Sequence, residues 1–346
     1  MALPASGQQI SANQISDEFG RNATGNSMSL GDYRLTQSVG SLSFNGIDSG
    51  VPSSGEIKFS DFHSKRLNVV VDFHTGGAVS RSNAKNRYNG NNVTVIGGFR
   101  GKKEAGSKIL IHVNKTIGSA KGNQNFVALR TGTWDSDVVL SVDVGSNGRL
   151  YGAGGDGGEG SNSFSDAGSQ NAGSGGNGTS ALGIEHEETA VNIQSGGRIR
   201  CGFGGGGGGS GARQVDSGAD RSACGGGGGG GAGLPAGNGG DRGNRLSGNE
   251  DEVTSGNPGG AGQLEENGEG GSGGNNADEA FGGSGGRGGD PSESPQNGNG
   301  GSPGDGSNVG AAGGNGAAIR RSNGNIVVDI TNAGDLTGDT SATGVA

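Results

Sequence analysis

The pattern of hydrophobic and polar positions divides the chain into three parts. Residues 1–66 are mostly polar, and their isolated anchors include Ile15 and Phe19, spaced as on one face of a short helix that stops at Gly20. From 67 to 151 the hydrophobic residues gather in short β-branched segments separated by Gly, Asn and Ser, a pattern that predicts strands and turns. These segments are 67–73, 93–96, 108–113 and 138–144. Beyond residue 151 glycine dominates, and large hydrophobic residues become sparse.

The middle part, residues 67–151, is the only stretch rich enough in large apolar residues to bury a conventional core. Its short, β-branched strands separated by Gly, Asn and Ser turns predict a β-sandwich-like domain. Trp134 is the sole tryptophan and lies in a turn-like stretch, where we expect it to anchor the packing.

A short repeat links the middle part to the glycine-rich part. Its pattern is apolar-x-apolar, three residues, Gly, any residue, apolar, which predicts a strand, a glycine turn and a second short strand. The copies are 142–152, 191–199 and 328–338. Because similar units separated by insertions tend to stack in one place, we expect a β base to which the chain returns three times.

Glycine accounts for 84 of the 346 residues, and most of it lies in dense runs after residue 151. Such runs disfavour α-helix, and collagen would need a strict Gly-X-Y period with more than the seven prolines present. A glycine sheet has no side chains to pack. Helices with three residues per turn can instead approach closely and satisfy each other's backbone groups. The runs therefore predict a polyglycine-II helix bundle, with a disordered linker as the alternative.

Each insertion that leaves and re-enters one base contains an even number of runs. We assign two runs to 152–190 and six to 202–327. This alternation predicts distal loops at 161–167, 212–223, 263–267 and 290–297, and basal turns at 241–255 and 275–281. The interruption Leu234-Pro235 would change the alternation if it forms a turn, and Arg242, Arg245 and Phe281 would then be distal.

Composition and charge narrow the function classes. The net charge is −9 and the basic residues are dispersed, which argues against a nucleic-acid binder. No apolar run approaches a membrane span, and Met1-Ala2-Leu3-Pro4 does not begin a signal peptide, so we expect cytoplasmic synthesis without general secretory export. Cys201 and Cys224 each begin a glycine run and are expected at opposite bundle ends, as free thiols.

No motif indicates catalysis. Glu185-His186-Glu187-Glu188 lacks a second spaced histidine for a metal, and none of the Gly-x-Gly-x-x-Gly matches opens a helix after a strand. We therefore predict a non-enzymatic protein with no cofactor and no metal.

The order of residues near the N-terminus carries a resemblance. Ile10-Ser11, Gln14-Ile15 and Glu18-Phe19-Gly20 are followed by Ser29-Leu30, Tyr33 and the stretch from Pro52 to Phe62. This series resembles a segment recurrent in tail and tail-fibre proteins of tailed bacteriophages. The resemblance implies a virion structural protein in which 1–66 is an attachment segment. Its candidate attachment residues are Ile15, Phe19, Tyr33, Phe59 and Phe62.

The glycine runs between strand-turn units, closing with 313–319, are similar to phage receptor-binding adhesins with polyglycine-II tips. The resemblance implies an all-β protein with an attachment segment (1–66), a β-sandwich-like domain (67–151) and a glycine-rich adhesin domain on a β base (152–346). In such adhesins, loops at one end of the bundle contact the bacterial surface, here a polysaccharide or an outer-membrane protein. The candidate contact residues are Phe164, Arg213, Arg221, Glu265, Glu266 and Glu293.

These observations predict a tail fibre or tail-tip protein of the virion, assembled in the host cytoplasm and bound to other tail or baseplate proteins. Two alternatives remain at this point: a purely structural virion component without receptor contact, and an ice-binding polyglycine-II protein. A homotrimer and a single chain are both open, because the sequence has no heptads to decide.

Overall fold

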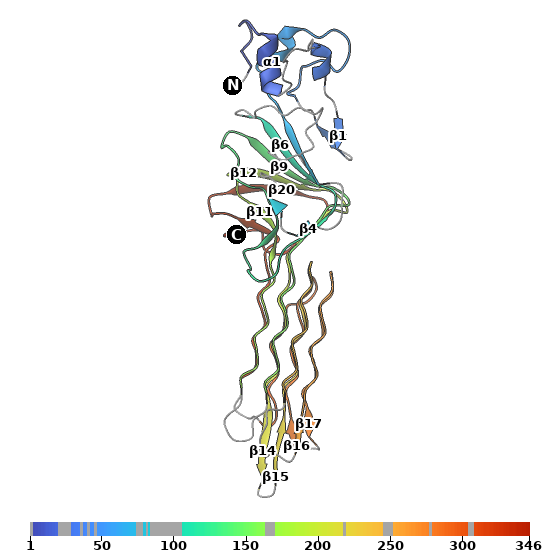
Figure 1. Ribbon diagram of the computed structural model, residues 1–346, viewed down its shortest axis with the longest axis vertical. Coiled ribbons are helices and arrows are strands. Elements are labelled where there is room, and N and C mark those ends of the chain that lie inside the picture. The colour runs from blue at the N-terminus through green and yellow to red at the C-terminus, as the bar shows by residue number, and fades with distance from the viewer. Residues whose placement is uncertain are drawn as a thin grey trace.

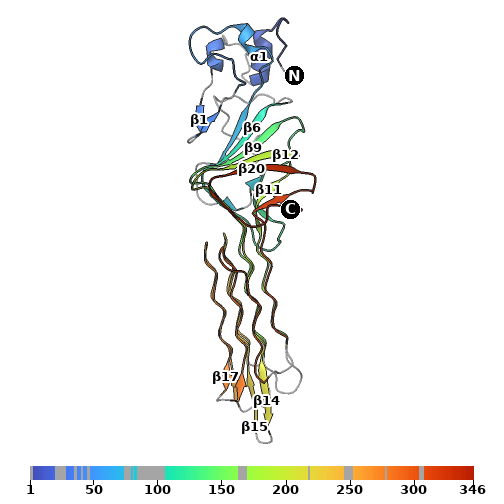
Figure 2. The ribbon, with the colours of Figure 1, turned by 180° about the vertical axis from the view of Figure 1, so that it is seen from behind.

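The computed structural model describes residues 3–19, 29–34, 37–39, 42–44, 47–73, 79–80, 82–83, 106–162, 170–216, 219–244, 252–276, 279–303 and 308–346. The molecule is elongated (Figures 1 and 2). A small N-terminal unit lies at one end, stacked β-strands form the middle, and a glycine-rich bundle extends to the far end. The predicted all-β character is confirmed, since the described residues contain one short α-helix and many strands. In these ranges no helix is long and apolar enough to cross a membrane.

The N-terminal unit is built from short elements around aromatic side chains. Its elements are α1 (Ala12–Phe19), the 3₁₀ helices η1 (Leu30–Tyr33) and η2 (Phe59–Phe62), and the hairpin β1 (Gln37–Val39) and β2 (Leu42–Phe44). Ser11 and Gln14 cap α1 reciprocally: the Ser11 N–H donates to Gln14 Oε1 at 2.8 Å, and the Gln14 N–H donates to Ser11 Oγ at 3.3 Å. The predicted helix is confirmed, and Gly20 lies outside the described residues.

Three aromatic rings form the centre of this unit. Phe19, Tyr33 and Phe62 are fully buried, with ring centroids 5.7 to 6.2 Å apart. Edge-on and tilted contacts of this kind add to the stabilisation from area burial. The cluster continues through Leu67 into the core of the β region, so the N-terminal unit closes one end of that core.

The β region is a three-sided solenoid whose strands pair in parallel. One face has the order β20-β12-β9-β6-β3, the second β21-β13-β10-β7-β4, and the third β22-β19-β11-β8-β5. The strands of the first face are β3 (Val69–Phe73), β6 (Lys108–Val113), β9 (Val139–Val144), β12 (Glu188–Ile193) and β20 (Val327–Asn332). Those of the second are β4 (Val79–Ser80), β7 (Thr116–Gly118), β10 (Arg149–Tyr151), β13 (Arg198–Arg200) and β21 (Asp335–Thr337). Those of the third are β5 (Ser82–Asn83), β8 (Val127–Arg130), β11 (Ser180–Ile184), β19 (Ile319–Arg321) and β22 (Ala342–Thr343).

Aligned apolar side chains fill the solenoid. Val71, Ile111, Val142 and Val191 stand in register on successive strands and are at most 1% exposed. Each buried side chain of this size stabilises the fold by roughly 1.5–3 kcal/mol. Trp134 joins the same core, as predicted.

The prediction of a β-sandwich is wrong. A sandwich packs two antiparallel sheets, whereas every strand pair of the three faces here is parallel. The predicted segments 67–73, 108–113 and 138–144 do form strands, while 93–96 lies outside the described residues. The three faces also take strands from both sides of residue 151, where we expect a domain boundary; that division stays a prediction.

The predicted strand-turn repeat is confirmed as successive coils of the solenoid. Val142 pairs with Val191 and Leu150 with Ile199, so the first two copies match position by position. In the third copy Leu336 pairs with Ile199 as aligned, but Val191 faces Ile330, two residues beyond the aligned Val328. The chain leaves the solenoid after β10 and β13 and re-enters at β11 and β19, which places both glycine-rich insertions on one side.

The insertions form a bundle of extended runs joined by backbone hydrogen bonds. The runs are 152–162, 170–179, 201–211, 224–232, 237–244, 255–262, 268–274, 282–289, 296–303 and 308–318. One of them, 224–232, is central. Its N–H groups donate with a period of three residues: Gly225, Gly228 and Gly231 to run 152–162, Gly226 and Gly229 to run 282–289, and Gly227 and Gly230 to run 255–262. Its carbonyls accept with the same period from runs 201–211, 237–244 and 268–274.

A central run with six neighbours leaves no room for side chains. A Cβ placed on Gly228 would lie 2.1 Å from the Gly206 oxygen, and one on Gly231 would lie 2.1 Å from the Phe203 oxygen. Real Cβ atoms do not approach backbone oxygens this closely. Glycine is therefore required in the centre because neighbouring backbones fill the space that a side chain would occupy.

Candidate functional site

The distal end of the bundle carries the structured loops. The hairpin β14 (Ala212–Asp216) and β15 (Ala219–Ala223) pairs in parallel with β16 (Glu252–Thr254), and a small hairpin of β17 (Asn275–Asn276) and β18 (Ala280–Phe281) lies beside them. These elements lie at the pole opposite the N-terminal unit (Figures 1 and 2). We call β14–β18 the distal tip.

Small buried side chains hold the tip onto the glycine lattice. Ala212, Ala223 and Ala280 are each 0% exposed and form a separate hydrophobic cluster. Phe281 exchanges two backbone hydrogen bonds of 2.8 Å with Ser302, which ties β18 to the neighbouring run. The loops are thus fixed at their bases by the lattice that they close.

The outer surface of the tip is charged and aromatic. Arg221 on β15 forms an ion pair with Glu279, the residue before β18. Phe281 exposes 41% of its surface, and the Arg213 backbone N–H donates to the Pro303 carbonyl at 3.2 Å. The tip thus carries one exposed aromatic ring and two arginines, and aromatic and arginine side chains dominate binding hot spots.

Two of the predicted contact residues lie at this tip. Arg213 and Arg221 belong to β14 and β15, so the predicted distal position of 212–223 is confirmed. Phe164 lies outside the described residues. That these side chains contact a host surface stays a prediction.

The predicted distal position of Glu265, Glu266 and Glu293 is wrong. Glu265 accepts a hydrogen bond of 3.2 Å from the Tyr151 hydroxyl and pairs with Arg198, both on the solenoid. Its other partner on β13, Arg200, lies 3.4 Å away. The turn 263–267 therefore lies at the base.

The remaining two glutamates belong to the same end of the bundle. The Glu266 carbonyl accepts the Gln263 N–H at 2.7 Å and closes the basal turn. Glu293 lies 3.6 Å from Arg287, within the turn 290–294, which borders Thr337 of the solenoid. None of the three glutamates belongs to the distal tip.

The error has one physical cause, a turn that the assignment of runs did not count. Residues 233–236 interrupt the stretch read as a single run, because Leu234 leaves the lattice and its backbone bonds to Ser119 and Gly152 at the base. The last stretch consists of two described runs, 296–303 and 308–318, so 201–318 contains eight runs instead of six. The turn at 233–236 exchanges the distal and basal ends for the turns that follow it. The described parts of the two predicted basal turns, β16 and the hairpin β17–β18, are therefore distal, and Phe281 was left out of the candidate contact residues although Leu234-Pro235 signalled the change.

The predicted attachment residues divide into buried and exposed. Ile15, Phe19, Tyr33 and Phe62 are 0% exposed and form the core of the N-terminal unit, so their side chains offer no surface to another protein. Phe59 is 41% exposed. Isolated hydrophobic residues in a polar segment can either contact another protein or form a small internal core, and the sequence alone does not distinguish the two.

The positions of the two thiols and of the acidic groups bear on disulfide and metal chemistry. Cys201 and Cys224 are buried and form no disulfide, and their backbone N–H groups donate to Thr337 on β21 and Thr254 on β16 respectively, which confirms their placement at opposite ends of the bundle. Across the described ranges, no group of three or more His, Cys, Asp or Glu residues could hold a metal ion. The predicted absence of a metal or a cofactor stays a prediction.

Comparison with known proteins gives a family. Residues 77–341 match the family model of the phage tail fibre adhesin Gp38. A search of curated proteins finds no match. Among solved structures, the gp37-gp38 adhesin tip complex of the bacteriophage S16 long tail fibre matches at 16% sequence identity and a TM-score of 0.35, covering 84% of this chain and 89% of that chain.

Proposed function

Because the chain belongs to the Gp38 family of phage tail fibre adhesins, we propose that it binds a receptor on the host bacterium through the distal tip. The observation that carries this proposal is the arrangement of the two ends: the tip and the N-terminal unit lie at opposite poles of an elongated molecule (Figure 1). One pole is then free to face the host when the other faces the virion. The family is one of phage tail fibre adhesins, which supports a place in the virion tail and a non-enzymatic, adhesive role.

We propose that the ten runs are polyglycine-II helices. Support comes from the hydrogen-bond partners of run 224–232, which repeat every three residues and point to six neighbours. A helix of three residues per turn rises about 3.1 Å per residue, so a nine-residue run spans about 28 Å. Cross-bonded in this way, the bundle is a stiff spacer that holds the tip away from the solenoid.

The surface proposed for host contact centres on Phe281, Arg221 and Arg213. Aromatic and arginine side chains supply much of the binding energy in protein interfaces. The receptor class we propose is a surface polysaccharide or an outer-membrane protein. Glu265, Glu266 and Glu293 are left out, because they lie at the base.

At the opposite pole we propose that the N-terminal unit attaches the chain to other phage tail fibre proteins through the surface around Phe59. This ring is exposed beside the exposed ion pair of Lys58 and Glu56, whose side chains are 3.2 Å apart. The buried aromatic cluster supports that surface from within.

Competition for adsorption tests the proposal. Purified full-length protein, mixed with host cells before the phage is added, should lower phage adsorption. Phe281→Asp should weaken this competition at least tenfold, which corresponds to about 1.4 kcal/mol. Leu264→Asp is the matched control, because Leu264 is 40% exposed but lies in a basal turn.

The outcomes separate the candidate functions. If the wild-type protein competes and only Phe281→Asp fails, the tip binds the receptor. If the folded wild-type protein neither binds host cells nor competes, the chain is a purely structural component of the fibre. Equal losses in both variants would place the contact surface elsewhere.

A further inference from the structure

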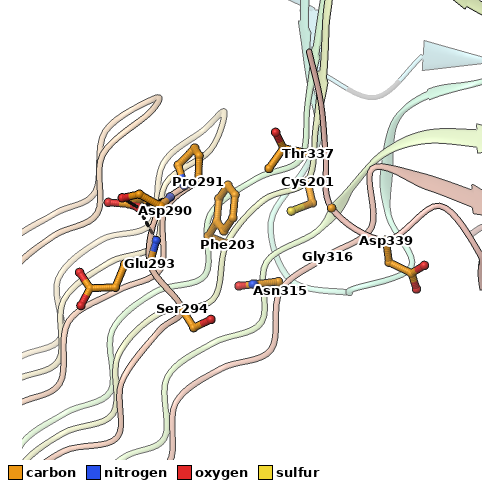
Figure 3. Close-up of a pocket in the computed structure, with 12 residues that line it drawn as sticks. Cys201, Phe203, Asp290, Pro291, Glu293, Ser294, Asn315, Gly316, Thr337 and Asp339 are labelled. Carbon is orange, nitrogen blue, oxygen red and sulfur yellow. Dashed lines mark hydrogen bonds between the residues drawn. The ribbon is translucent and has the colours of Figure 1, made fainter. Parts of the chain in front are cut away.

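A cavity of 470 Å³ lies where the bundle joins the solenoid (Figure 3). Four segments distant in sequence line it: 201–203, 290–294, 315–316 and 337–339. The turn 290–294 closes one side, and the segment after β21 closes the other. Its volume lies in the range of pockets that hold small molecules, about 300–1,000 Å³.

The lining of the cavity includes a proline, an aromatic ring and a thiol, of which Phe203 is 6% and Cys201 2% exposed. The Phe203 ring stands between Pro291 and Cys201 in Figure 3. Burial raises the pKa of the Cys201 thiol to about 12, so this sulfur is uncharged at neutral pH. Ring, proline and thiol together offer a surface suited to C–H groups.

The rim of the cavity is polar and carries negative charge. Its residues are Asp290, Ser292, Glu293, Ser294, Asn315, Thr337 and Asp339. None of the described residues that line the cavity is a lysine or an arginine. The rim therefore presents carboxylate, hydroxyl and amide oxygens, and its negative charge is offset in part by Arg287, which lies 3.6 Å from Glu293.

The rim groups are held in place before any ligand arrives. Asp290 Oδ1 accepts hydrogen bonds from the Ser292 N–H at 2.7 Å, the Ser292 hydroxyl at 2.8 Å and the Glu293 N–H at 2.9 Å. Burial alone would raise the pKa of Asp290, but these bonds outweigh it and lower the pKa, so the carboxylate stays ionised. Asn315 Oδ1 accepts the Gly204 N–H at 3.0 Å, which orients its amide.

This combination restricts the ligand. A phosphate or an acidic sugar would meet three carboxylates, and no lysine or arginine is among the described residues that line the cavity, while Arg287 beside it already pairs with Glu293. A purely apolar molecule would desolvate the charged rim groups without forming hydrogen bonds to them, which is unfavourable. A hexose offers C–H groups for the exposed Pro291 and for the small exposed part of Phe203, and a ring of hydroxyl donors for the rim. We propose that the cavity binds one unit of a neutral or amino sugar.

The position of the cavity gives the site a role, which rests on the proposed function of the tip. It lies at the base, one run length from the distal tip, or about 28 Å. With the tip on a receptor at the outer-membrane surface, the cavity would stand at the height of the surface polysaccharide. The two sites would then contact two layers of the same envelope.

Direct binding to the purified full-length protein tests the site. The probes are the methyl glycosides of glucose, galactose, mannose and N-acetylglucosamine, together with glucosamine, glucuronic acid and the methyl ester of N-acetyl-lysine. Saturation-transfer NMR and calorimetry give the affinities, expected in the millimolar range for single sugar units. Ser294→Trp fills the cavity from an exposed position, and Glu266→Trp places the same side chain on the neighbouring basal turn.

The expected result is saturable binding of at least one neutral or amino sugar, weakened at least tenfold by Ser294→Trp and unchanged in Glu266→Trp. Glucuronic acid should bind more weakly than glucose. The proposal is overturned if no neutral or amino sugar binds, if Ser294→Trp binds as the wild type does, or if only the lysine derivative binds. Because the assay contains no host cell, its result does not depend on whether the tip binds a receptor.

Discussion

Gly228 offers the sharpest test of the glycine lattice, because its replacement by alanine adds one methyl group to the centre of the bundle. The new Cβ would lie 2.1 Å from the Gly206 oxygen, where ordinary contact begins at 3.4 Å, so run 201–211 must move by about 1.3 Å. The nearest bond between these runs joins the Gly206 N–H to the Gly229 oxygen at 2.8 Å. A shift of this size breaks that bond.

The magnitude follows from the two buried groups left without partners. Each costs about 1–3 kcal/mol, so the pair costs about 2–6 kcal/mol. Replacing glycine also restricts the unfolded chain, which returns about 0.4–1 kcal/mol. The net loss is a large part of the roughly 5–15 kcal/mol by which a typical protein is stable. We expect Gly228→Ala to lower the midpoint of thermal unfolding by several degrees.

Gly300→Ala is the matched control. Nothing lies within 4 Å of a Cβ at this exposed position of run 296–303. Gly300→Ala restricts the unfolded chain as much as Gly228→Ala does, but its Cβ meets no neighbouring atom. Its midpoint of thermal unfolding should therefore equal or slightly exceed that of the wild type. Calorimetry and circular dichroism of both variants measure the difference. A midpoint for Gly228→Ala within one degree of Gly300→Ala would refute the account of close-packed backbones.

Three further substitutions test other parts of the molecule. Burial raises the pKa of Glu18, because the folded state favours the protonated carboxylic acid over the carboxylate. The stability that the protonated acid contributes is present at low pH and is lost as the pH rises through the folded-state pKa. Glu18→Gln should therefore raise the unfolding midpoint at pH 7, and this gain should vanish near pH 4; equal gains at both would contradict it. Phe19→Ala empties the centre of the N-terminal aromatic cluster and should cost about 3–5 kcal/mol in denaturant unfolding. Burial, and to a lesser extent the Glu265 charge, raises the pKa of Tyr151. Glu265→Gln should lower that pKa in an ultraviolet titration, while Glu266→Gln leaves it unchanged.

The sequence predicts the strands and the repeat well, but not how the strands associate. Short β-branched segments between glycine turns look the same in a sandwich and in a solenoid. The distinction lies in which distant strands pair, for example Val142 with Val191. The alignment of the repeat copies does match Val142 with Val191. The two coils that precede the first copy, beginning with β3 and β6, do not show the repeat in their sequence, so the full set of five stacked coils could not be recognised.

The site shows a similar division. The existence of an outward and returning bundle follows from the strands on both sides of each insertion. Which loops are distal depends on counting turns, and one residue pair, Leu234-Pro235, decides the ends for Arg242, Glu265 and Phe281. Glycine runs contain no side-chain pattern that marks where a run stops. The count therefore depends on the few residues that cannot enter the lattice.

The central run 224–232 also limits how such a molecule can change in length. Since its bonds return to the same neighbour every three residues, an insertion of one or two residues would turn the rest of the run toward the wrong neighbours. An insertion of three residues leaves each hydrogen-bonding group facing its original neighbour. The surrounding runs must then lengthen by the same amount, about 9 Å for the proposed polyglycine-II helices. Lengthening the spacer thus requires coordinated insertions at many places in one gene. The distal loops are under no such constraint of phase, so a change in their length leaves the contacts between the runs in register.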